Sequence, residues 1–273
     1  IYAVEVTSLF ENIKIGEKFS ENNLAVMRAK KGEINGSKLK FLLNKKSKSA
    51  YSKFDCIKRK ELLKIGIFIT ARLKSTRLPF KAIRPILGKP MIEWMIERLK
   101  HCQVKPIVIM TSTNRQDDPL IKIAKKNKID YFRGDEEDVL IRMRDCARKF
   151  KVDLIISATA DNPLVEPYLI EKQIERYLKT KFDFCETVGL PLGCGAYVVS
   201  QEALEKVCAI KNDSNTEIWG PFFKKCPKTL KCEFIKIRDP SIKKPDYRLT
   251  VDTPEDFKLI THIIKRLSKE KKY

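Results

Sequence analysis

From residue 65 onward, apolar segments with the length of strands alternate with amphipathic segments that have the period of a helix. Strands are expected at 65–70, 106–111, 129–132, 153–157, 182–187 and 232–237, and helices at 91–102, 120–126, 139–150, 166–178 and 254–267. Strict alternation of this kind is typical of an α/β fold with a largely parallel sheet between helices. In such folds ligands bind beyond the carboxyl ends of the strands, so a site is expected in the loops there.

The first 64 residues have a different pattern. Their apolar segments are short and are separated by Gly16, Gly32 and Gly36. Short apolar segments broken by turn residues predict a small, loop-rich, mostly β module. We therefore expect two domains, at residues 1–64 and 65–273, which is compatible with the usual range of domain sizes.

The charge balance of the chain is strongly basic. Lysine and arginine number 56 against 35 acidic residues, which gives a formal net charge of +21. Such an excess implies an anionic partner, for example a nucleotide, an acidic metabolite, a nucleic acid or a membrane surface. The aromatic residues fall mainly at core spacing and form no basic-aromatic stripe that would stack bases, so we expect no nucleic-acid partner. No apolar run approaches the ~18 residues of a membrane span, so none is expected.

Histidine and cysteine usage narrows the chemistry. The two histidines, His101 and His262, have no Cys or His at metal-ligand spacing, which argues against a His-rich zinc site and a Ser-His-Asp hydrolase. The eight cysteines are scattered without a C-x-x-C pair, which predicts free thiols in a reducing cytoplasm. An enzyme built from this chain is therefore expected to work with carboxylates, Lys, Arg and a hard metal ion.

A basic loop follows the first expected strand of the larger domain. It reads Thr-Ala-Arg-Leu-Lys-Ser-Thr-Arg-Leu-Pro-Phe-Lys at 70–81 and carries the cations Arg72, Lys74, Arg77 and Lys81. Arg and Lys side chains offer charged donors to phosphate oxygens, so the loop suits a triphosphate. The competing interpretation is a solvated basic loop, which is common in a lysine-rich chain. The sequence contains neither a Walker loop nor a G-x-G-x-x-G dinucleotide loop.

Two aspartates fall near further strand ends. Asp161 follows the strand expected at 153–157, and Asp252 lies in Leu-Thr-Val-Asp-Thr-Pro-Glu-Asp at 249–256, where a short strand is expected to run into a helix. A carboxylate pair with water and phosphate oxygens is the usual way in which Mg²⁺ is held. Asp252 also fits a helix start, with Thr or Asp as the N-cap and Pro at the first position. The sequence leaves both interpretations of Asp252 open.

Five motifs occur in an order that resembles a known family. They read Ala-Arg-Leu-Lys-Ser-Thr-Arg-Leu-Pro-Phe-Lys at 71–81, Leu-Gly-Lys-Pro-Met at 87–91, Gly-Asp-Glu-Glu-Asp-Val-Leu-Ile-Arg at 134–142, Thr-Ala-Asp-Asn-Pro-Leu at 159–164 and Val-Asp-Thr-Pro-Glu-Asp at 251–256. Residues 65–273 resemble the cytidylyltransferases that activate acidic sugars, most closely the acylneuraminate cytidylyltransferases of spore-coat and surface polysaccharide synthesis. The resemblance implies a Rossmann-like nucleotidyltransferase fold and CMP transfer from CTP to an acidic nine-carbon sugar such as sialic or legionaminic acid, with release of pyrophosphate.

The resemblance also implies roles for individual residues. Lys81, Arg77 and Asp161 would serve in catalysis, which then rests on positioning and electrostatics without a protein nucleophile. Asp161 and Asp252 would hold Mg²⁺, and Arg142 and Gly193 would contact the sugar. The implied nucleotide-binding residues are Ala71, Arg72, Ser75, Arg77, Lys81 and Thr113.

Other segments of the larger domain keep two interpretations. The Gly-Leu-Pro-Leu-Gly-Cys-Gly segment at 189–195 either lines the sugar site or is a turn. The segment at 217–223 either forms a wall of the sugar site or a contact in the expected homodimer. The chain also departs from the family pattern, with Phe80 in place of a common Gly, Ser157 in place of an Arg and Ala160 in place of a Gly. These departures bear on the identity of the sugar more than on the reaction.

The first 64 residues resemble the antifreeze-like (SAF) domain that ends sialic acid synthases. The resemblance rests on Asn-Ile-Lys-Ile-Gly-Glu-Lys-Phe-Ser-Glu-Asn-Asn-Leu-Ala-Val-Met-Arg at 12–28 and on Ile1, Tyr2 and Ala3, which match the start of that domain. It implies that Arg28 contacts the sugar in a partner's barrel, and that a synthase barrel lies upstream or acts in trans. The competing functions are a CMP-Kdo-type or other sugar nucleotidyltransferase, or a non-catalytic module that docks on a sialic acid synthase.

Overall fold

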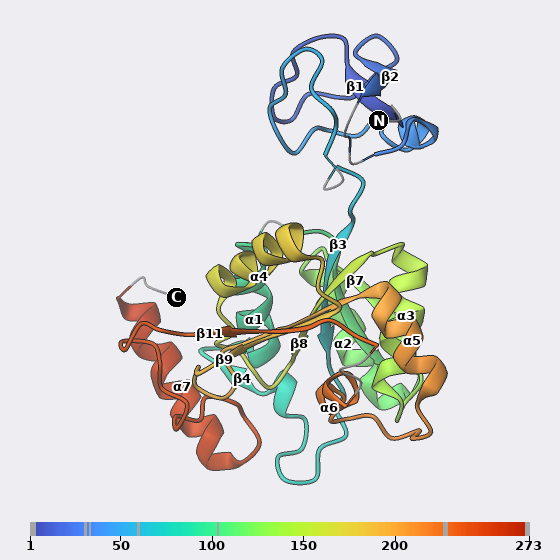
Figure 1. The fold of residues 1–273 in the computed structure, drawn as a ribbon. Coiled ribbons are helices and arrows are strands. Elements are labelled where there is room, and N and C mark those ends of the chain that lie inside the picture. The colour runs from blue at the N-terminus through green and yellow to red at the C-terminus, as the bar shows by residue number, and fades with distance from the viewer. Residues whose placement is uncertain are drawn as a thin grey trace. The chain divides into compact units, whose positions relative to one another are not determined.

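The computed structural model describes residues 4–29, 32, 34–58, 61–102, 104–225 and 229–270. The chain divides into two compact units, Ile1–Leu63 and Lys64–Tyr273 (Figure 1). The proposed start of an SAF domain at Ile1, Tyr2 and Ala3 lies outside the described residues, as does Cys226. The seven cysteines that are described form no disulfide with one another.

The first unit is built around one antiparallel strand pair. Strand β1 (Val4–Leu9) pairs with β2 (Leu24–Ala29), and a 3₁₀ helix, η1 (Gly36–Phe41), follows them. The other described residues of this unit form loops and turns joined by isolated bridges, so β1 and β2 are the only strands described in the module that was expected to be mostly β. The core of the unit is formed by Leu9, Ile13, Phe19, Leu24, Ile34, Leu42, Tyr51 and Ile57.

A seven-stranded sheet is the centre of the second unit. Its order is β11-β9-β10-β8-β3-β6-β7, and every pairing is parallel except the two made by β10. The expectation of an α/β fold with a mostly parallel sheet is confirmed. The strands are β3 (Ile65–Thr70), β6 (Ile107–Ser112), β7 (Asp130–Gly134), β8 (Leu154–Thr159), β9 (Phe184–Val188), β10 (Tyr197–Ser200) and β11 (Cys232–Lys236).

Helices cover both faces of this sheet. Helices α3, α5 and α6 share one apolar cluster with strand residues such as Phe68 and Ile155, so they pack on one face. Helix α1 contacts the N-cap of α4 through Arg98 and Glu166, and α1 and α7 share a second apolar cluster. The helices are α1 (Met91–Lys100), α2 (Asp118–Lys126), α3 (Val139–Phe150), α4 (Pro167–Thr180), α5 (Gln201–Ile210), α6 (Gly220–Lys224) and α7 (Pro254–Lys269).

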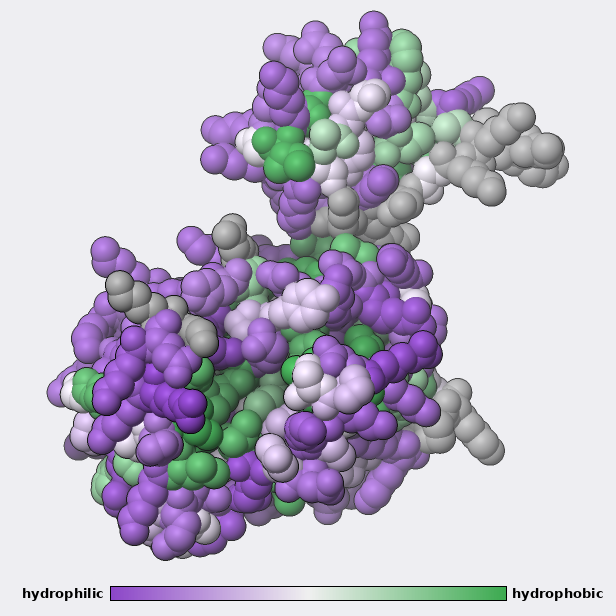
Figure 2. All heavy atoms as spheres, turned by 90° about the vertical axis from the view of Figure 1, so that its left-hand side faces the viewer, coloured by the Kyte–Doolittle hydropathy of each residue, from purple (hydrophilic) through white to green (hydrophobic). Residues whose placement is uncertain are grey.

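Short elements complete the second unit. They are the 3₁₀ helices η3 (Lys81–Ile83) and η4 (Arg115–Asp117) and the strand pair β4 (Pro85–Ile86) and β5 (Lys89–Pro90). Hydrophilic residues cover much of the side seen in Figure 2, and apolar side chains gather in a band across the middle of the second unit. Within the part of the chain that is described, no helix has the length and apolar character to cross a bilayer.

The position of β3 in the sheet indicates where a ligand binds. Strand β6 lies on one side of β3 and β8 on the other, so the chain reverses its direction of travel across the sheet at this point. The loops that leave the carboxyl ends of β3 and β8 therefore diverge and leave a crevice between them. These are the loops that contain the basic segment and Asp161.

Candidate functional site

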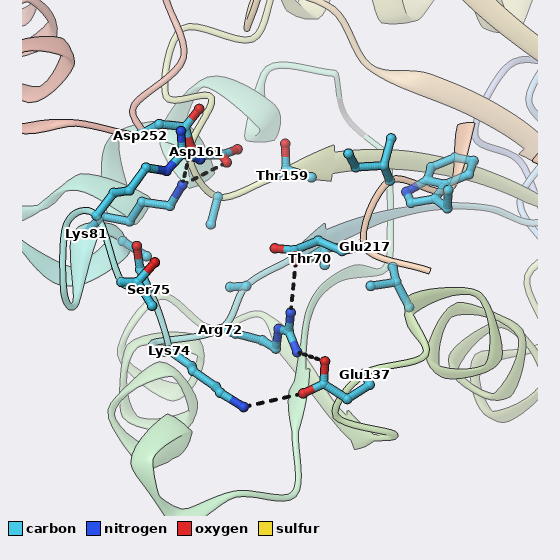
Figure 3. Close-up of a pocket in the computed structure, with 18 residues that line it drawn as sticks. Thr70, Arg72, Lys74, Ser75, Lys81, Glu137, Thr159, Asp161, Glu217 and Asp252 are labelled. Atoms are coloured by element: carbon cyan, nitrogen blue, oxygen red, sulfur yellow. Dashed lines mark hydrogen bonds and ion pairs between the residues drawn. The ribbon is translucent and has the colours of Figure 1, made fainter. Parts of the chain in front are cut away.

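A cavity of about 630 Å³ opens beyond the carboxyl ends of β3 and β8 (Figure 3). Seven residues singled out from the sequence line it: Ala71, Arg72, Ser75, Arg77, Lys81, Asp161 and Asp252. Its other lining residues are Thr70, Lys74, Thr76, Ala82, Glu137, Val139, Thr159, Ala160, Glu217, Ile218 and Trp219. The sequence motifs at 71–81, 159–164 and 251–256 therefore meet around one space.

Lys81 joins the two aspartates of the site. Its Nζ donates to Asp161 Oδ2 at 3.0 Å, to Asp252 Oδ1 at 2.9 Å and to the carbonyl oxygen of Val251 at 2.9 Å. Burial lowers the pKa of Lys81, but the nearby carboxylates outweigh it, so the pKa is raised and the amine stays charged. The ammonium holds together two carboxylates that would otherwise repel each other.

Asp252 contacts two further cations. Arg77 lies 3.3 Å from its Oδ1, and Arg248 donates to its Oδ2. Burial raises the pKa of Asp252, but the contacts with Lys81, Arg248 and Arg77 reverse the effect, so the pKa is lowered and the group is ionised. Thr253, and not Asp252, is the N-cap of α7: its hydroxyl accepts from the backbone N–H of Asp256 at 3.2 Å. The Asp252 side chain therefore serves the cavity.

The segment that carries Asp252 is not the short strand expected from the sequence. One isolated bridge joins Arg248 to Leu192, and the backbone N–H of Val251 donates to the carbonyl oxygen of Asp161 at 2.8 Å. Gly193 permits this close packing because its φ is +100° and a Cβ there would lie 2.7 Å from the backbone of residues 249 and 250. These backbone contacts hold the segment in place, but they involve too few residues to form a strand.

The other cations of the basic loop have acidic partners. Arg72 donates to the carbonyl oxygen of Glu136 at 2.5 Å and lies 3.4 Å from Glu137 and 3.6 Å from Glu217. Lys74 lies 3.5 Å from both Glu136 and Glu137. Arg72 is the main cause of the lowered pKa of Glu137. A bound polyphosphate would compete with these carboxylates for Arg72 and Lys74.

Asp117 supports the basic loop and was missed by the sequence reasoning. It is buried, and its carboxylate accepts from the backbone N–H of Leu73 at 2.8 Å, the hydroxyl of Thr111 at 2.8 Å and the backbone N–H of Ser112 at 3.2 Å. Its side chain does not cap α2. The carboxylate therefore ties the basic loop to the end of β6. The only sequence signal is an acidic residue between a strand and a helix, which is usually a cap.

Phe80 adopts a left-handed backbone conformation, with φ of 57° and ψ of 25°. Glycine reaches this region without steric cost, which explains why the resembling family commonly has Gly at this position. The turn directs the chain into η3, whose first residue is Lys81. The geometry of the loop is thus kept even though the residue differs from the family pattern.

Three residues predicted to bind ligands line neither this cavity nor the adjoining one, which Gly193 lines. Thr113 is exposed in the turn after β6. Arg142 is wholly buried and donates to the carbonyl oxygens of Asp135 and Glu136, so it supports the loop that contacts Arg72. Burial, with Arg72 nearby, lowers the pKa of Arg142 to about 10. Arg28 is exposed on β2 of the first unit. Their predicted roles stay predictions.

A second cavity of about 340 Å³ shares Thr159 and Trp219 with the first. Trp219 is buried and packs against Tyr197 and Phe184, so it is both a core residue and a wall of the two cavities. The segment at 189–195 and the start of the segment at 217–223 both line cavities. The lining of the second cavity comprises Ser157, Ala158, Thr159, Asn162, Glu186, Thr187, Val188, Gly189, Leu190, Pro191, Leu192, Gly193, Gly195, Ala196, Tyr197 and Trp219.

Asp161 and Asp252 have the chemistry to hold a divalent cation. Asp161 Oδ1 is buried and has no hydrogen-bond partner, as is expected of an oxygen reserved for a ligand. No group of three or more His, Cys, Asp or Glu side chains at metal-binding positions occurs among the described residues. Two carboxylates are nevertheless sufficient for Mg²⁺, because substrate phosphates and water complete its coordination. The residues therefore fit the predicted ion.

Two known proteins are similar in sequence to most of this chain. The chain is 32% identical over 203 residues to an uncharacterized protein of Methanocaldococcus jannaschii, covering 74% of this chain and 83% of the relative. It is 30% identical over 203 residues to the spore coat polysaccharide biosynthesis protein SpsF of Bacillus subtilis, covering 72% of this chain and 84% of the relative.

Solved structures show the same fold. A cytidylyltransferase from Leptospira borgpetersenii matches with a TM-score of 0.67 and 26% identity over 76% of this chain and 95% of that one. A CMP:2-keto-3-deoxy-manno-octonic acid synthetase complexed with CTP matches with a TM-score of 0.59 and 16% identity over 74% and 99%. Residues 66–273 match the family model described as cytidylyltransferase. The chain therefore belongs to the cytidylyltransferase family and is a nucleotidyltransferase.

Proposed function

We propose that this enzyme transfers CMP from CTP to an acidic nine-carbon sugar and releases pyrophosphate. The observation that carries the proposal is the cluster of Lys81, Asp161 and Asp252, which lies beside a loop of phosphate-binding cations. A second, less charged cavity adjoins it at Thr159 and Trp219. The first cavity is assigned to the nucleotide, and the second to the sugar.

The first cavity suits a triphosphate because it is lined by four cations. Arg77 is largely exposed and can turn toward a ligand, whereas Lys81 is held in place by its three hydrogen bonds. Arg72 and Lys74 exchange their contacts with Glu137 and Glu217 for contacts with phosphate oxygens. Charge-assisted hydrogen bonds to phosphate then replace salt bridges that are partly exposed and weak.

The reaction needs positioning and charge stabilisation rather than a protein nucleophile. A sugar hydroxyl oxygen bonds to the α-phosphorus, the bond to the bridging oxygen breaks, and pyrophosphate leaves with that electron pair while the hydroxyl proton passes to solvent. Lys81 stabilises negative charge at the reacting phosphate and fixes both carboxylates. Asp161 and Asp252 would hold Mg²⁺, which when bound neutralises charge on the α-phosphate and on pyrophosphate.

The nature of the sugar is inferred from the second cavity and from the relatives. No Lys, Arg or His is among the described residues that line this cavity. Ser157, which does line it, stands where the resembling family has an Arg. The neutral part of the sugar is therefore assigned to this cavity and its carboxylate to the side of the cationic loop. Relatives named for spore coat polysaccharide and for CMP-linked keto-deoxy-octonic acid support an acidic sugar in surface glycan synthesis.

The test is a pyrophosphate-release assay with the full chain, CTP and Mg²⁺. The acceptors are sialic, legionaminic and pseudaminic acids and the eight-carbon acid Kdo, each compared with reactions that lack the sugar, CTP or the metal. Release only in the complete mixture with a nine-carbon acid supports the proposal. Turnover of Kdo alone favours the CMP-Kdo alternative. If no acceptor supports pyrophosphate release, the proposal is overturned. If, in addition, the chain does not bind CTP, the non-catalytic docking module is favoured.

The first unit is proposed to be SAF-like, with Arg28 reaching the sugar of a sialic acid synthase barrel supplied upstream or in trans. Its exposure on β2 supports this role. Addition of the full chain to a synthase barrel should raise synthase activity, and Arg28→Ala should abolish that gain without changing pyrophosphate release. An equal gain with Arg28→Ala contradicts the role. A homodimer and a cytoplasmic location are part of the same proposal.

A further inference from the structure

The second cavity contains one carboxylate, that of Glu186, and the reaction proposed for this enzyme gives Glu186 no role. Apart from Glu186, its polar lining consists of uncharged side chains such as Ser157, Thr159, Asn162 and Tyr197. The first cavity, by contrast, is lined by four cations as well as by its two aspartates. A single carboxylate in an otherwise neutral cavity indicates a specific contact with a substrate rather than general electrostatic attraction.

Strand register places Glu186 at a defined distance from the reaction site. Ser157 on β8 is paired with Tyr197 on β10. On the other side of β10, Val198 is paired with Cys185 of the antiparallel strand β9, so Glu186 lies opposite Tyr197. Neighbouring strands are about 4.8 Å apart, so Glu186 lies about 10 Å from Ser157 across the sheet. Ser157 in turn is on the strand that leads to Asp161. Glu186 is thus at the end of the cavity remote from the aspartates.

Lys224 of α6 holds the Glu186 side chain in place. Its Nζ lies 2.5 Å from Glu186 Oε2 and 5.9 Å from the centre of the Phe234 ring. Burial lowers the pKa of Lys224, but Glu186 outweighs it and the pKa is raised, so the amine of Lys224 stays charged. Lys224 balances the charge of Glu186, yet Glu186 Oε2 is buried and makes no hydrogen bond. A neutral donor, such as a hydroxyl, suits this oxygen better than a second cation.

Two further polar atoms of the cavity have no partner. Ser157 Oγ and Asn162 Oδ1 are buried and make no hydrogen bond, although the Asn162 amide nitrogen donates to Thr159 at 2.8 Å. Buried polar atoms are normally satisfied, so an unpaired set around one cavity indicates a ligand with several hydroxyl or amide groups. Ser157, Asn162 and Glu186 all line this cavity.

We propose that Glu186 determines specificity by accepting a hydrogen bond from a hydroxyl at the end of the sugar remote from the reacting hydroxyl. The enzyme would then prefer acids with a hydroxylated terminal carbon to acids whose terminal carbon is a methyl group. This inference rests on the proposed function, because it assigns the second cavity to the sugar. A methyl group would leave the carboxylate oxygen without a donor in a buried place, which is the situation in which hydrogen bonds discriminate strongly.

The experiment compares two acceptors that differ at one atom. Pyrophosphate release is measured with N-acetylneuraminate and its 9-deoxy analogue, or with Kdo and its 8-deoxy analogue if only the eight-carbon acid is used. We expect kcat/KM of the wild-type chain to be about 10- to 100-fold higher for the hydroxylated acid, the range expected of a hydrogen bond to a charged group. The difference should lie mainly in KM for the sugar.

Variants at Glu186 show whether this residue is responsible. Glu186→Ala should bring the ratio of kcat/KM values close to one, and Glu186→Gln, which keeps an acceptor oxygen without the charge, should give an intermediate ratio. The matched control is Glu233→Gln: this carboxylate of β11 contacts Arg176 at 2.5 Å, does not line the cavity, and its loss should leave the ratio unchanged. KM for CTP reports whether the nucleotide site of each variant is intact.

The outcomes separate this inference from the proposed function. A wild-type ratio near one, or a ratio that Glu186→Ala leaves unchanged, overturns the assignment of Glu186 while sugar turnover still supports the function. Failure of every acidic sugar overturns the function itself. Loss of the preference in Glu186→Ala with an unchanged KM for CTP supports the inference, because a merely structural role would affect both acceptors equally.

Discussion

Lys81 is the residue on which the arrangement of the reaction site depends. Its ammonium makes hydrogen bonds to side chains from two segments that are distant in sequence, at Asp161 and Asp252. Without Lys81, the two carboxylates would repel each other, and only Asp252 would keep cationic partners, which are Arg77 and Arg248. The charge of Lys81 therefore has a structural effect on the aspartates as well as an electrostatic effect on a bound phosphate.

Substitution of Lys81 by Met should keep the length of the side chain and remove the charge. We expect kcat for pyrophosphate release to fall by about 100-fold or more, as is usual when a preorganised donor to the transition state is lost. Steady-state kinetics with CTP and the accepted sugar measure the effect. Lys172→Met is the control, because Lys172 pairs with Glu175 on the exposed side of α4. Equal rates for the two variants would contradict the role of Lys81.

The lowered pKa of Asp252 predicts how stability depends on pH. The carboxylate stabilises the folded state above its ordinary pKa of 3.8, and this contribution is lost as the pH falls through the lower folded value. Asp252→Asn should therefore lower the free energy of unfolding by about 1–3 kcal/mol at pH 7, and the difference should shrink below pH 3.8. Denaturant titrations between pH 2 and 7, roughly the range where carboxyl groups titrate, measure it. If the free energy of unfolding of the wild-type chain and that of Asp252→Asn depend on pH in the same way, the stabilising role of the Asp252 carboxylate is refuted.

Some of these residues could be predicted from the sequence and others could not. The cations of the basic loop and Asp161 stand next to apolar strands, so their place at a sheet edge followed from the pattern alone. Asp252 needed the structure, because a helix cap and a ligand position look alike in Asp-Thr-Pro-Glu. Asp117 looked like a helix cap, and its contact with Leu73, which is distant in sequence, needed the structure. Glu186 gave no signal, since its partner Lys224 is also distant in sequence.

At the level of elements, backbone packing in the loops decides where the site residues lie. Gly193 allows the 189–195 segment to pack against residues 249 and 250, immediately before Asp252. The Leu192 N–H donates to the carbonyl oxygen of Tyr247 at 2.8 Å, and the Leu249 N–H donates to that of Leu192 at 2.7 Å. The wall of the second cavity and the position of Asp252 are therefore mechanically linked.

Gly193→Ala should disturb both cavities at once. A Cβ at Gly193 would lie 2.7 Å from backbone atoms, and φ of +100° is unfavourable for alanine, so a destabilisation of about 1–3 kcal/mol is expected. Turnover should fall with it because Asp252 moves. Gly88→Ala is a matched control, since Gly88 also has a positive φ, of +74°, but its Cβ would meet no atom within 4 Å. Thermal unfolding and turnover of both variants check this, and equal behaviour would show that the packing is not tight.

The regular elements were predicted better than the short ones. Strand β3 and helix α3 have the bounds expected from the sequence, because long apolar or amphipathic segments give a clear period. Strand β10, with four residues, and helix α6, with five, are too short to show one. Helix α5 was missed because it starts directly after β10, with Ser200 as its N-cap. The missed strand is the one that makes the sheet mixed.

At the level of the whole molecule, each unit has its own hydrophobic core. The core of the first unit contains residues from Leu9 to Ile57, and the clusters of the second unit begin at Phe68. The change of pattern near residue 64 could be predicted from the sequence because each core needs its own apolar segments.

Separate cores predict two separate unfolding transitions. In differential scanning calorimetry of the full chain, we expect a small transition for Ile1–Leu63 and a larger one for Lys64–Tyr273. CTP with Mg²⁺ should raise the temperature of the larger transition only, because ligand binding stabilises the unit that binds it. A single transition that shifts as a whole on addition of CTP would show that the two units unfold together.

The antiparallel course of β10 has a consequence for how such proteins can diversify. Strands β9 and β10 are neighbours joined by one connection, residues 189–196, whose residues form a wall of the second cavity. That wall is thus one hairpin, encoded as a single continuous stretch and anchored at both ends in the sheet. Exchange of this hairpin between relatives would alter acceptor preference in one step, provided that the incoming hairpin keeps a glycine at position 193, where it packs against residues 249 and 250 beside Asp252.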